Sequence, residues 1–201
     1  DPRLRQSDFR DQAADPVAPA LGCGIAELDE QQGIFVIGSN LRMEVPIIAH
    51  RVRKAARKGA SVAFLNPATY EYHFPIAAYV EAPLEQFVSQ LAGVVAAAAQ
   101  LTEAVVPAHV QQTVAAASFG DAQRAVAQAL GKGRRLILLG HIAQRHPRFA
   151  ELRSLAAALA TITGAKLGYL AEGANGVGAT LAGALPHRGA GGTTVTSPGH
   201  D

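Results

Sequence analysis

Three short stretches of the chain are apolar at almost every position, and each ends at residues that favour a turn. They are IFVI at 34–37 before Gly38, VAFL at 62–65 before Asn66 and Pro67, and LILL at 136–139 before Gly140. A strand that is covered on both faces has a continuous apolar run of this kind. We therefore predict buried strands at 33–38, 61–67 and 134–140, and shorter strands at 77–80 and 165–170.

The stretches between these runs repeat their apolar residues every three or four positions, which is typical of helices. Pro46 fits the first position of a basic helix, and Gly59 fits its end. A second helix follows Pro83, where Leu84, Phe87, Val88, Leu91, Val95 and Ala98 have helical spacing. Further helices are predicted at 107–117, 121–130 and 147–164. The glycine-rich stretch 171–192 is predicted to be a loop.

Strands that alternate with helices predict an α/β fold, a Rossmann-like three-layer sandwich with a mostly parallel sheet. We expect residues 34–185 to form this domain. Residues 1–33 are expected to be a partial N-terminal segment of a longer chain, because DPRLRQSDFRDQ has neither Met nor a signal-peptide core. Residues 186–201 are expected to be a Gly-rich tail that truncates the domain.

Ligands of such sheets bind beyond the carboxyl ends of the strands, near the point where the strand order reverses. Four predicted loops follow strands, at 38–40, 66–69, 140–141 and 172–178, and we expect them to meet at one edge of the sheet. In the first, Gly38 permits close backbone approach, while Ser39 and Asn40 can bind phosphate or hydroxyl groups. The competing interpretation is an ordinary turn that ends a strand.

The stretch GANGVG at 173–178 is similar to a phosphate-binding loop, but its spacing matches neither the dinucleotide nor the P-loop pattern. The competing interpretation is a tight connection with positive φ at one of Gly173, Gly176 or Gly178. The seven histidines have no metal-ligand spacing and no neighbouring carboxylate, so surface or capping positions are expected. Glu44 and Glu172 are expected to be charged surface residues. We predict neither a catalytic residue nor a metal ligand.

Composition narrows the function further. Cys23 is the only cysteine, which excludes an internal disulfide and a four-thiolate cluster. A net charge of +2 is too small to indicate nucleic-acid binding. The basic residues at 50–58 fit either a solvated helix face or a contact with an acidic partner. The longest apolar run, 91–101, is too short for a membrane span.

Two longer stretches carry a family resemblance. VIGSNLRMEVPIIAHRVRKAARKGASVAFLNP at 36–67 resembles the molybdopterin oxidoreductase superfamily, whose members have a GSN-P-R-x-E-x-P loop, a basic helix and an Asp-Pro-Arg-like turn. The stretch from Gly140 to Gly192, with EGANGVGATLAGALPHR, is similar to one branch. That branch comprises the large peripheral-arm subunits of bacterial NADH:quinone oxidoreductase, or respiratory complex I. Residues 100–130 carry little of the resemblance.

In molybdenum-containing members, the resemblance implies a molybdopterin guanine dinucleotide held at Gly38, Ser39, Asn40, Asn66 and Pro67. This chain has Leu41 where Pro is usual, Asn66 in place of the acid and Ala68 in place of Arg. Each lost charge-assisted hydrogen bond costs about 1.5–3 kcal/mol. We therefore predict a vestigial pocket, with Asn175 at its edge, and no cofactor in this segment. The resemblance places 4Fe-4S and 2Fe-2S clusters in a preceding region of the parent subunit.

The resemblance implies a non-catalytic structural domain in a complex that transfers electrons from NADH to quinone and translocates protons. Its partners would be other peripheral-arm subunits, on the cytoplasmic side of the bacterial inner membrane. An alternative is the cofactor-binding domain of a molybdopterin guanine dinucleotide enzyme of the formate dehydrogenase type. A third is a plain nucleotide-binding domain, like the central domain of thiamine-dependent enzymes, which leaves the second stretch unexplained.

Overall fold

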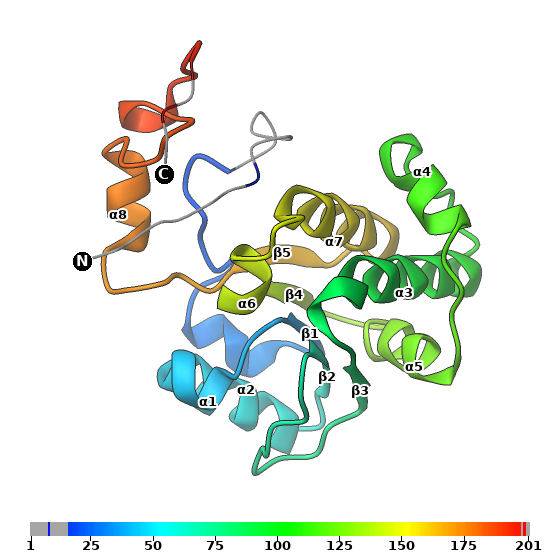
Figure 1. Cartoon of the computed structure of the whole chain (residues 1–201). Helices are drawn as coiled ribbons and strands as arrows, with labels where there is room; N and C mark the ends of the chain where they lie inside the picture. The colour runs from blue at the N-terminus through cyan, green and yellow to red at the C-terminus, as the bar shows by residue number, and fades with distance from the viewer. Residues whose placement is uncertain (1–7, 9–15, 198, 200–201) are drawn as a thin grey trace.

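The apolar runs form one five-stranded sheet in which every strand is parallel to its neighbours. The computed structural model describes residues 8, 16–197 and 199 (Figure 1). The strand order is β3-β2-β1-β4-β5. The strands are β1 (Gly33–Ile37), β2 (Ser61–Asn66), β3 (Ala78–Glu81), β4 (Arg135–Leu139) and β5 (Lys166–Tyr169). The predicted Rossmann-like α/β fold is confirmed.

The order of the strands reverses between β1 and β4, which pair in register from Gly33 opposite Arg135 to Ile37 opposite Leu139. The chain leaves β1 toward β2 and β3, then returns to β4 and β5 on the other side of β1. The loops after β1 and β4 therefore start side by side. This is the position at which doubly wound sheets bind ligands.

Helices cover the two faces of the sheet unequally. One face packs against α3 (Phe87–Thr102), α5 (Asp121–Ala129) and α7 (Phe149–Thr163), and Figure 1 shows α3 between the other two. The opposite face packs against α2 (Pro46–Arg57), with η2 (Ala26–Glu30) beside it. Alternate residues of β1 divide between the two cores, Phe35 and Ile37 on the first face, Ile34 and Val36 on the second.

The helix boundaries follow the sequence signals closely. Pro46 stands at the first position of α2. Gly164 ends α7 with a φ of 68°, a left-handed conformation that glycine adopts without steric cost. A short 3-10 turn, η3 (Leu84–Gln86), precedes α3. The helix α4 (Ala108–Ala115) lies outside the sandwich, where it buries only Val110 and Val114.

Three short helices were absent from the sequence-based prediction. They are α1 (Leu41–Glu44), α6 (His141–Gln144) and α8 (Gly176–Leu181). The prediction of a loop throughout 171–192 is therefore wrong, because α8 and the 3-10 turn η4 (Ala190–Gly192) lie within it. Each helix is too short to show a helical repeat of apolar residues. Of the three glycines considered in the 173–178 stretch, Gly173 has the positive φ, of 77°.

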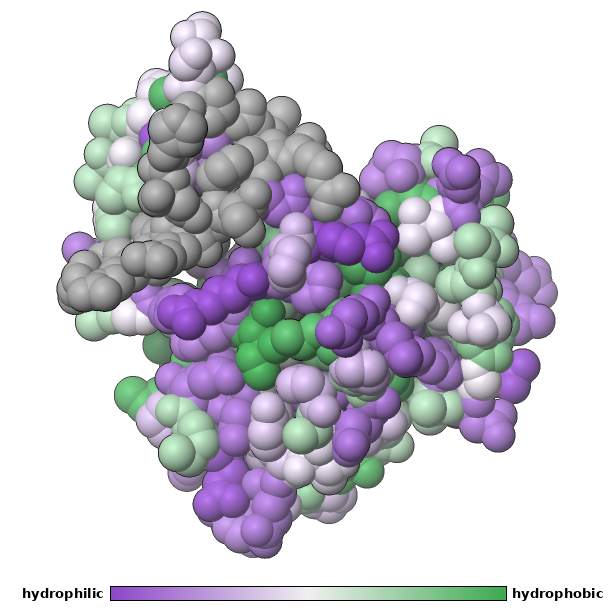
Figure 2. Space-filling model, in the orientation of Figure 1, coloured by the Kyte–Doolittle hydropathy of each residue, from purple (hydrophilic) through white to green (hydrophobic). Residues whose placement is uncertain are grey.

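The predicted domain boundaries at 33/34 and 185/186 stay predictions. Of the opening stretch 1–12, only Asp8 lies within the described residues, where its carboxylate accepts a hydrogen bond from the backbone N–H of Ala150 at 2.9 Å. Among the helices of the described residues, none is long and apolar enough to cross a membrane. Figure 2 shows a largely hydrophilic face, with a hydrophobic area beside α6 in the middle of the view.

Candidate functional site

The candidate site is the rim formed by residues 38–40, 66 and 140–141, at the carboxyl ends of β1, β2 and β4. Gly38 has a φ of 66°, and Gly140 lies directly against it. A Cβ atom at position 140 would come within 2.3 Å of the Gly38 carbonyl oxygen and 2.4 Å of the Ser39 Cβ. The two loops thus touch through their backbones, and only glycine fits between them.

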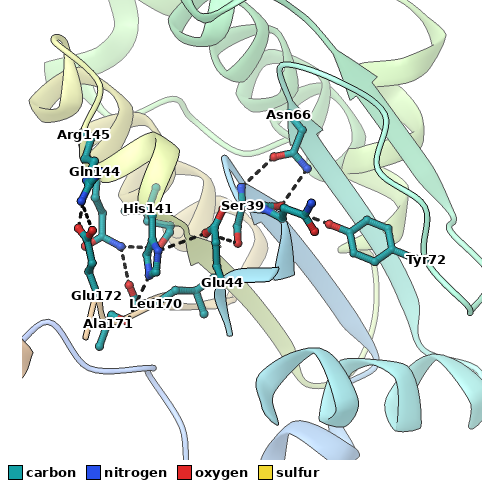
Figure 3. A network of polar contacts seen from close by, with 12 residues as sticks. Ser39, Glu44, Asn66, Tyr72, His141, Gln144, Arg145, Leu170, Ala171 and Glu172 are labelled. Atoms are coloured by element: carbon teal, nitrogen blue, oxygen red, sulfur yellow. Dashed lines mark hydrogen bonds and ion pairs between the residues drawn. The ribbon is translucent and has the colours of Figure 1, made fainter. Parts of the chain in front are cut away.

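Asn66 connects the end of β2 to the loop after β1. Its Oδ1 accepts a hydrogen bond from the Ser39 N–H at 2.8 Å, and its Nδ2 donates to the Ser39 carbonyl at 3.1 Å (Figure 3). Nδ2 also lies 3.2 Å from the hydroxyl of Tyr79. Asn66 and Ser39 are both 0% exposed. The amide of Asn66 therefore has its donor and acceptor groups engaged within the fold.

Tyr72 closes the same loop from another side. Its hydroxyl donates to the Ser39 carbonyl at 3.2 Å, and its ring stacks on Phe64 with 4.5 Å between the ring centroids. Burial raises the pKa of the Tyr72 phenol. The phenol therefore stays protonated and remains a hydrogen-bond donor to the backbone of the rim.

Glu44 engages the loop after β1 with both of its carboxylate oxygens. The Ser39 hydroxyl donates to its Oε2 at 2.8 Å, and the Asn40 N–H donates to its Oε1 at 2.9 Å. The Glu44 side chain is 18% exposed, so it is more buried than the charged surface position that the sequence suggested. Its carboxylate therefore helps to fix the conformation of this loop.

His141 joins Glu44 to the loop after β5. Its Nδ1 lies 3.4 Å from Glu44 Oε2, and its Nε2 lies 3.2 Å from the carbonyl oxygen of Ala171. The expectation that no carboxylate orients a histidine is therefore wrong here. The sequence did not predict this contact, because Glu44 and His141 are far apart in the chain. They follow β1 and β4, which become neighbours only in the folded sheet.

Two of the other histidines are buried, although surface positions were expected. His146 is 6% exposed and His187 is 1% exposed. The Nδ1 of His146 accepts the backbone N–H of Arg148 at 2.9 Å, just before α7, which is the capping role that was considered. A repeating pattern of apolar residues does not identify such positions, because a histidine breaks the pattern even when it is buried.

A small cavity that is open to solvent lies beside the rim between α6, α7 and α8. Its lining includes Gln144, Arg145, Phe149, Tyr169, Glu172 and Thr180. Arg145 spans its edge by an ion pair with Glu172, with Nε 3.1 Å from Oε2. Gln144 donates to the carbonyl oxygens of Leu139 and Leu170, which fixes α6 to the ends of β4 and β5 (Figure 3).

The structure brings together most of the residues that the sequence predicted for the pocket. Gly38, Ser39, Asn40 and Asn66 meet at the rim, and Pro67 follows Asn66. Asn175 is exposed at the start of α8, where its Oδ1 lies over Gly178, and no contact of its side chain with the rim is found among the described residues. Sequence reasoning missed Tyr72 and Tyr79. It placed the 140–141 loop at the rim but did not foresee the contact of His141 with Glu44.

The chemistry of this arrangement is limited. The Ser39 hydroxyl donates to the Glu44 carboxylate and is 0% exposed, so a substrate cannot reach it as a nucleophile. Among the described residues, no group of three or more His, Cys, Asp or Glu side chains is placed to hold a metal ion. Cys23 lies outside the rim, and burial raises the pKa of its thiol, which disfavours the thiolate.

A family model described as molybdopterin oxidoreductase matches residues 6–195, which is most of the chain. A search of curated proteins finds no matching relative.

Proposed function

The chain belongs to the molybdopterin oxidoreductase family, and we propose that its α/β domain serves as scaffold and not as a cofactor site. The observation that carries this proposal is the turn after β2, where Asn66 stands in place of the acid and Ala68 in place of the Arg. The amide of Asn66 is already bonded to the backbone N–H and carbonyl of Ser39. The turn therefore offers a dinucleotide neither a carboxylate for its hydroxyls nor a guanidinium group for its phosphates.

The packing of the rim supports the same conclusion. Ser39 and Asn66 are fully buried, and Gly140 lies against Gly38 without room for a Cβ atom. Asn66 and Ala68 replace the acid and the Arg that the family resemblance implies, so a charged contact for hydroxyls and one for phosphate are both missing. The residues present at the rim do not fit a molybdopterin guanine dinucleotide.

The more specific part of the proposal concerns the parent protein. We infer that this is the non-catalytic structural domain of a large peripheral-arm subunit of NADH:quinone oxidoreductase. The support is the sequence from Gly140 to Gly192, which resembles that branch. On this proposal, iron–sulfur clusters lie elsewhere in the subunit, its partners are other peripheral-arm subunits, and it resides on the cytoplasmic side of the inner membrane.

The alternative, a cofactor-binding domain of the formate dehydrogenase type, is compatible with the family match. The cavity beside α6 favours it, because its lining combines Arg145 and Gln144 with an aromatic side chain at the carboxyl end of the sheet. The alternative predicts that molybdenum accompanies the full-length protein. The scaffold proposal predicts none in stoichiometric amount.

Equilibrium dialysis with guanosine diphosphate tests the domain itself, since this probe carries the nucleotide half of the cofactor. We expect no saturable binding at micromolar concentrations by the chain or by its Glu172→Gln control. Glu44→Gln frees the Ser39 and Asn40 donors from a negative charge, so any gain in affinity is expected in this variant alone. Micromolar binding by the unaltered chain, or stoichiometric molybdenum in the full-length protein, refutes the scaffold proposal.

A further inference from the structure

The outer face of α2 combines exposed cations with exposed apolar side chains. Helical spacing places Ile47, His50 and Arg57 on the side away from the buried residues Ala49, Val52, Ala55 and Ala56, and the exposed Arg53 lies at the edge of this side. Ile47 is 68% exposed, and Met43, at the preceding turn, is 80% exposed. Two large apolar side chains are thus exposed four residues apart in the chain, at the start of a helix that also carries exposed cations.

The cations of α2 divide into two groups. Arg51 and Lys54 form ion pairs with Asp29 of η2, and Arg51 lies 3.0 Å from it. Among the described residues, Arg53 and Arg57 form no ion pair and no hydrogen bond through their side chains. The helix itself contains no acidic residue. Two guanidinium groups on one side of the helix are thus available to carboxylates outside the fold.

We propose that Met43, Ile47, Arg53 and Arg57 form a docking face for an acidic, apolar segment of a partner protein. The chain already shows this chemistry on the neighbouring flank of α2. There η2 (AELDE) docks with Leu28 fully buried and Asp29 on Arg51 and Lys54. A partner segment with leucine-type side chains on Met43 and Ile47, and carboxylates on Arg53 and Arg57, has the matching charge and polarity.

The observations favour a protein over the two other anionic partners. A basic helix binds a membrane surface by inserting its apolar face, but the apolar face of α2 is buried against the sheet. Nucleic acid is bound by a concentrated array of cations, whereas this face offers two unpaired guanidinium groups beside two apolar side chains. In Figure 2 the region of α1 and α2 is mostly hydrophilic, with small hydrophobic areas among the polar atoms. The inference holds whichever assembly contains the domain.

A designed helical peptide is the probe for this face. It carries two leucines four positions apart and a cluster of glutamates one to two turns away, with a scrambled peptide of the same composition as reference. We expect the chain to bind the designed peptide more tightly than the scrambled one, in fluorescence anisotropy titrations. Raising the salt concentration is expected to weaken binding, because the contact between the guanidinium groups and the glutamates is exposed to solvent.

Paired substitutions test whether peptide binding depends on this face or only on the overall charge of the protein surface. Arg53→Glu with Arg57→Glu is expected to weaken peptide binding by about tenfold or more. Lys132→Glu with Lys166→Glu, which changes the same charge at exposed positions elsewhere, is expected to stay within about twofold. Met43→Ser with Ile47→Ser is expected to weaken binding by about tenfold, and Val105→Ser, at a site that is 89% exposed, to leave it unchanged.

Several outcomes overturn the proposal. They are equal binding of the scrambled peptide, equal losses in the control variants, or no saturable binding at all. Binding to phosphatidylserine vesicles or to duplex DNA that exceeds peptide binding, and that is lost with Arg53 and Arg57, assigns the face to a membrane or to nucleic acid. Self-association in sedimentation velocity that Met43→Ser with Ile47→Ser abolishes assigns it to a second copy of the chain.

Discussion

Two neighbouring parts of the chain, the loop after β1 at the rim and the outer face of α2, differ in how their polar groups are paired. At the rim, Ser39, Asn66 and Glu44 satisfy one another and the backbone around them. On α2, Arg53 and Arg57 point away from the buried side of the helix and pair with no other described residue. The Ser, Asn and Glu side chains of the rim are of types that often bind ligands, but they are already paired within the fold. The two arginines of α2 are not paired within it, so the helix is the better candidate for binding a partner.

The difference shows why a polar residue is not a binding residue until its partners are known. A buried donor or acceptor must be satisfied, and a fold that satisfies it internally has used it for stability. An exposed cation with no partner contributes little to stability and remains available. Substitutions at the rim should therefore change the free energy of unfolding, whereas substitutions on the outer face of α2 should change binding.

The largest effect is expected from Gly140→Ala, which tests whether the loops after β1 and β4 really touch. The new methyl group would lie 2.3 Å from the Gly38 carbonyl oxygen, so the two loops must separate. We expect a loss of about 3 kcal/mol in the free energy of unfolding, measured by urea denaturation. Gly176→Ala is the control, because nothing lies within 4 Å of its Cβ position. A variant at 140 as stable as this control would mean that the rim is open.

Asn66→Ala is expected to have the next largest effect. It removes the acceptor for the Ser39 N–H and the donor to the Ser39 carbonyl, both in a fully buried position. The Ser39 N–H would be left unsatisfied, and the Ser39 carbonyl would keep only the Tyr72 hydroxyl, which is expected to cost about 2 kcal/mol. Asn175→Ala, at an exposed position with no side-chain capping bond, is expected to stay within about 0.5 kcal/mol. Equal losses in the two variants, again in urea denaturation, would contradict the role given to Asn66.

Asn66 and Asn175 also show how much of the candidate site could be predicted from the sequence. Both are predicted for one pocket, Asn66 from the family resemblance, and both lie in loops that are expected to meet at one edge of the sheet. The rule that places ligand loops at strand ends correctly brought Asn66 to the rim. It did not place Asn175, because the direction of a glycine-rich connection after an edge strand depends on tertiary packing, which no local pattern contains.

The fold was more predictable than the site for a physical reason. Continuous apolar runs identify buried parallel strands, and the alternation of strands with helices then leaves few topologies. The site depends on contacts between side chains far apart in sequence, such as Glu44 with His141 and Asn66 with Tyr79. The pairing of β1 with β4 creates the first contact, and the pairing of β2 with β3 the second.

A smaller effect, confined to acid, is expected at Asp29, whose contacts join η2 to the inner flank of α2. Hydrogen bonds from Lys54 and Arg51 hold the pKa of this carboxyl below its ordinary value of 3.8. A group with a lowered folded pKa stabilises the fold above its unfolded pKa, and this stabilisation is lost as the pH falls through the folded pKa. Asp29→Asn should therefore be less stable than the unaltered chain near neutral pH, and the gap should close below about pH 4.

Urea denaturation at a series of pH values measures this gap. Asp121→Asn is the matched control, because the Asp121 side chain is fully exposed beside Arg124. Its stability is expected to stay within about 0.5 kcal/mol of that of the unaltered chain, because only the exposed attraction of the Asp121 charge to Arg124 and to the amino end of α5 is lost. A constant gap between the Asp29 variant and the unaltered chain down to strongly acidic pH would show that the Asp29 charge does not hold η2 on α2.

The smallest loss of stability is expected from Arg53→Gln with Arg57→Gln. This variant tests whether the arginines of α2 differ from the polar residues of the rim in having no structural role. Neither guanidinium group has a partner among the described residues, so what is lost is the attraction of the Arg57 charge to the carboxyl end of the helix, about 0.5 kcal/mol or less. Arg51→Gln with Lys54→Gln removes the same charge from the same helix but leaves Asp29 without its cations, so a clearly larger loss in urea denaturation is expected. Equal losses in the two variants would make the outer face as structural as the inner one, and the reason to assign it to a partner would disappear.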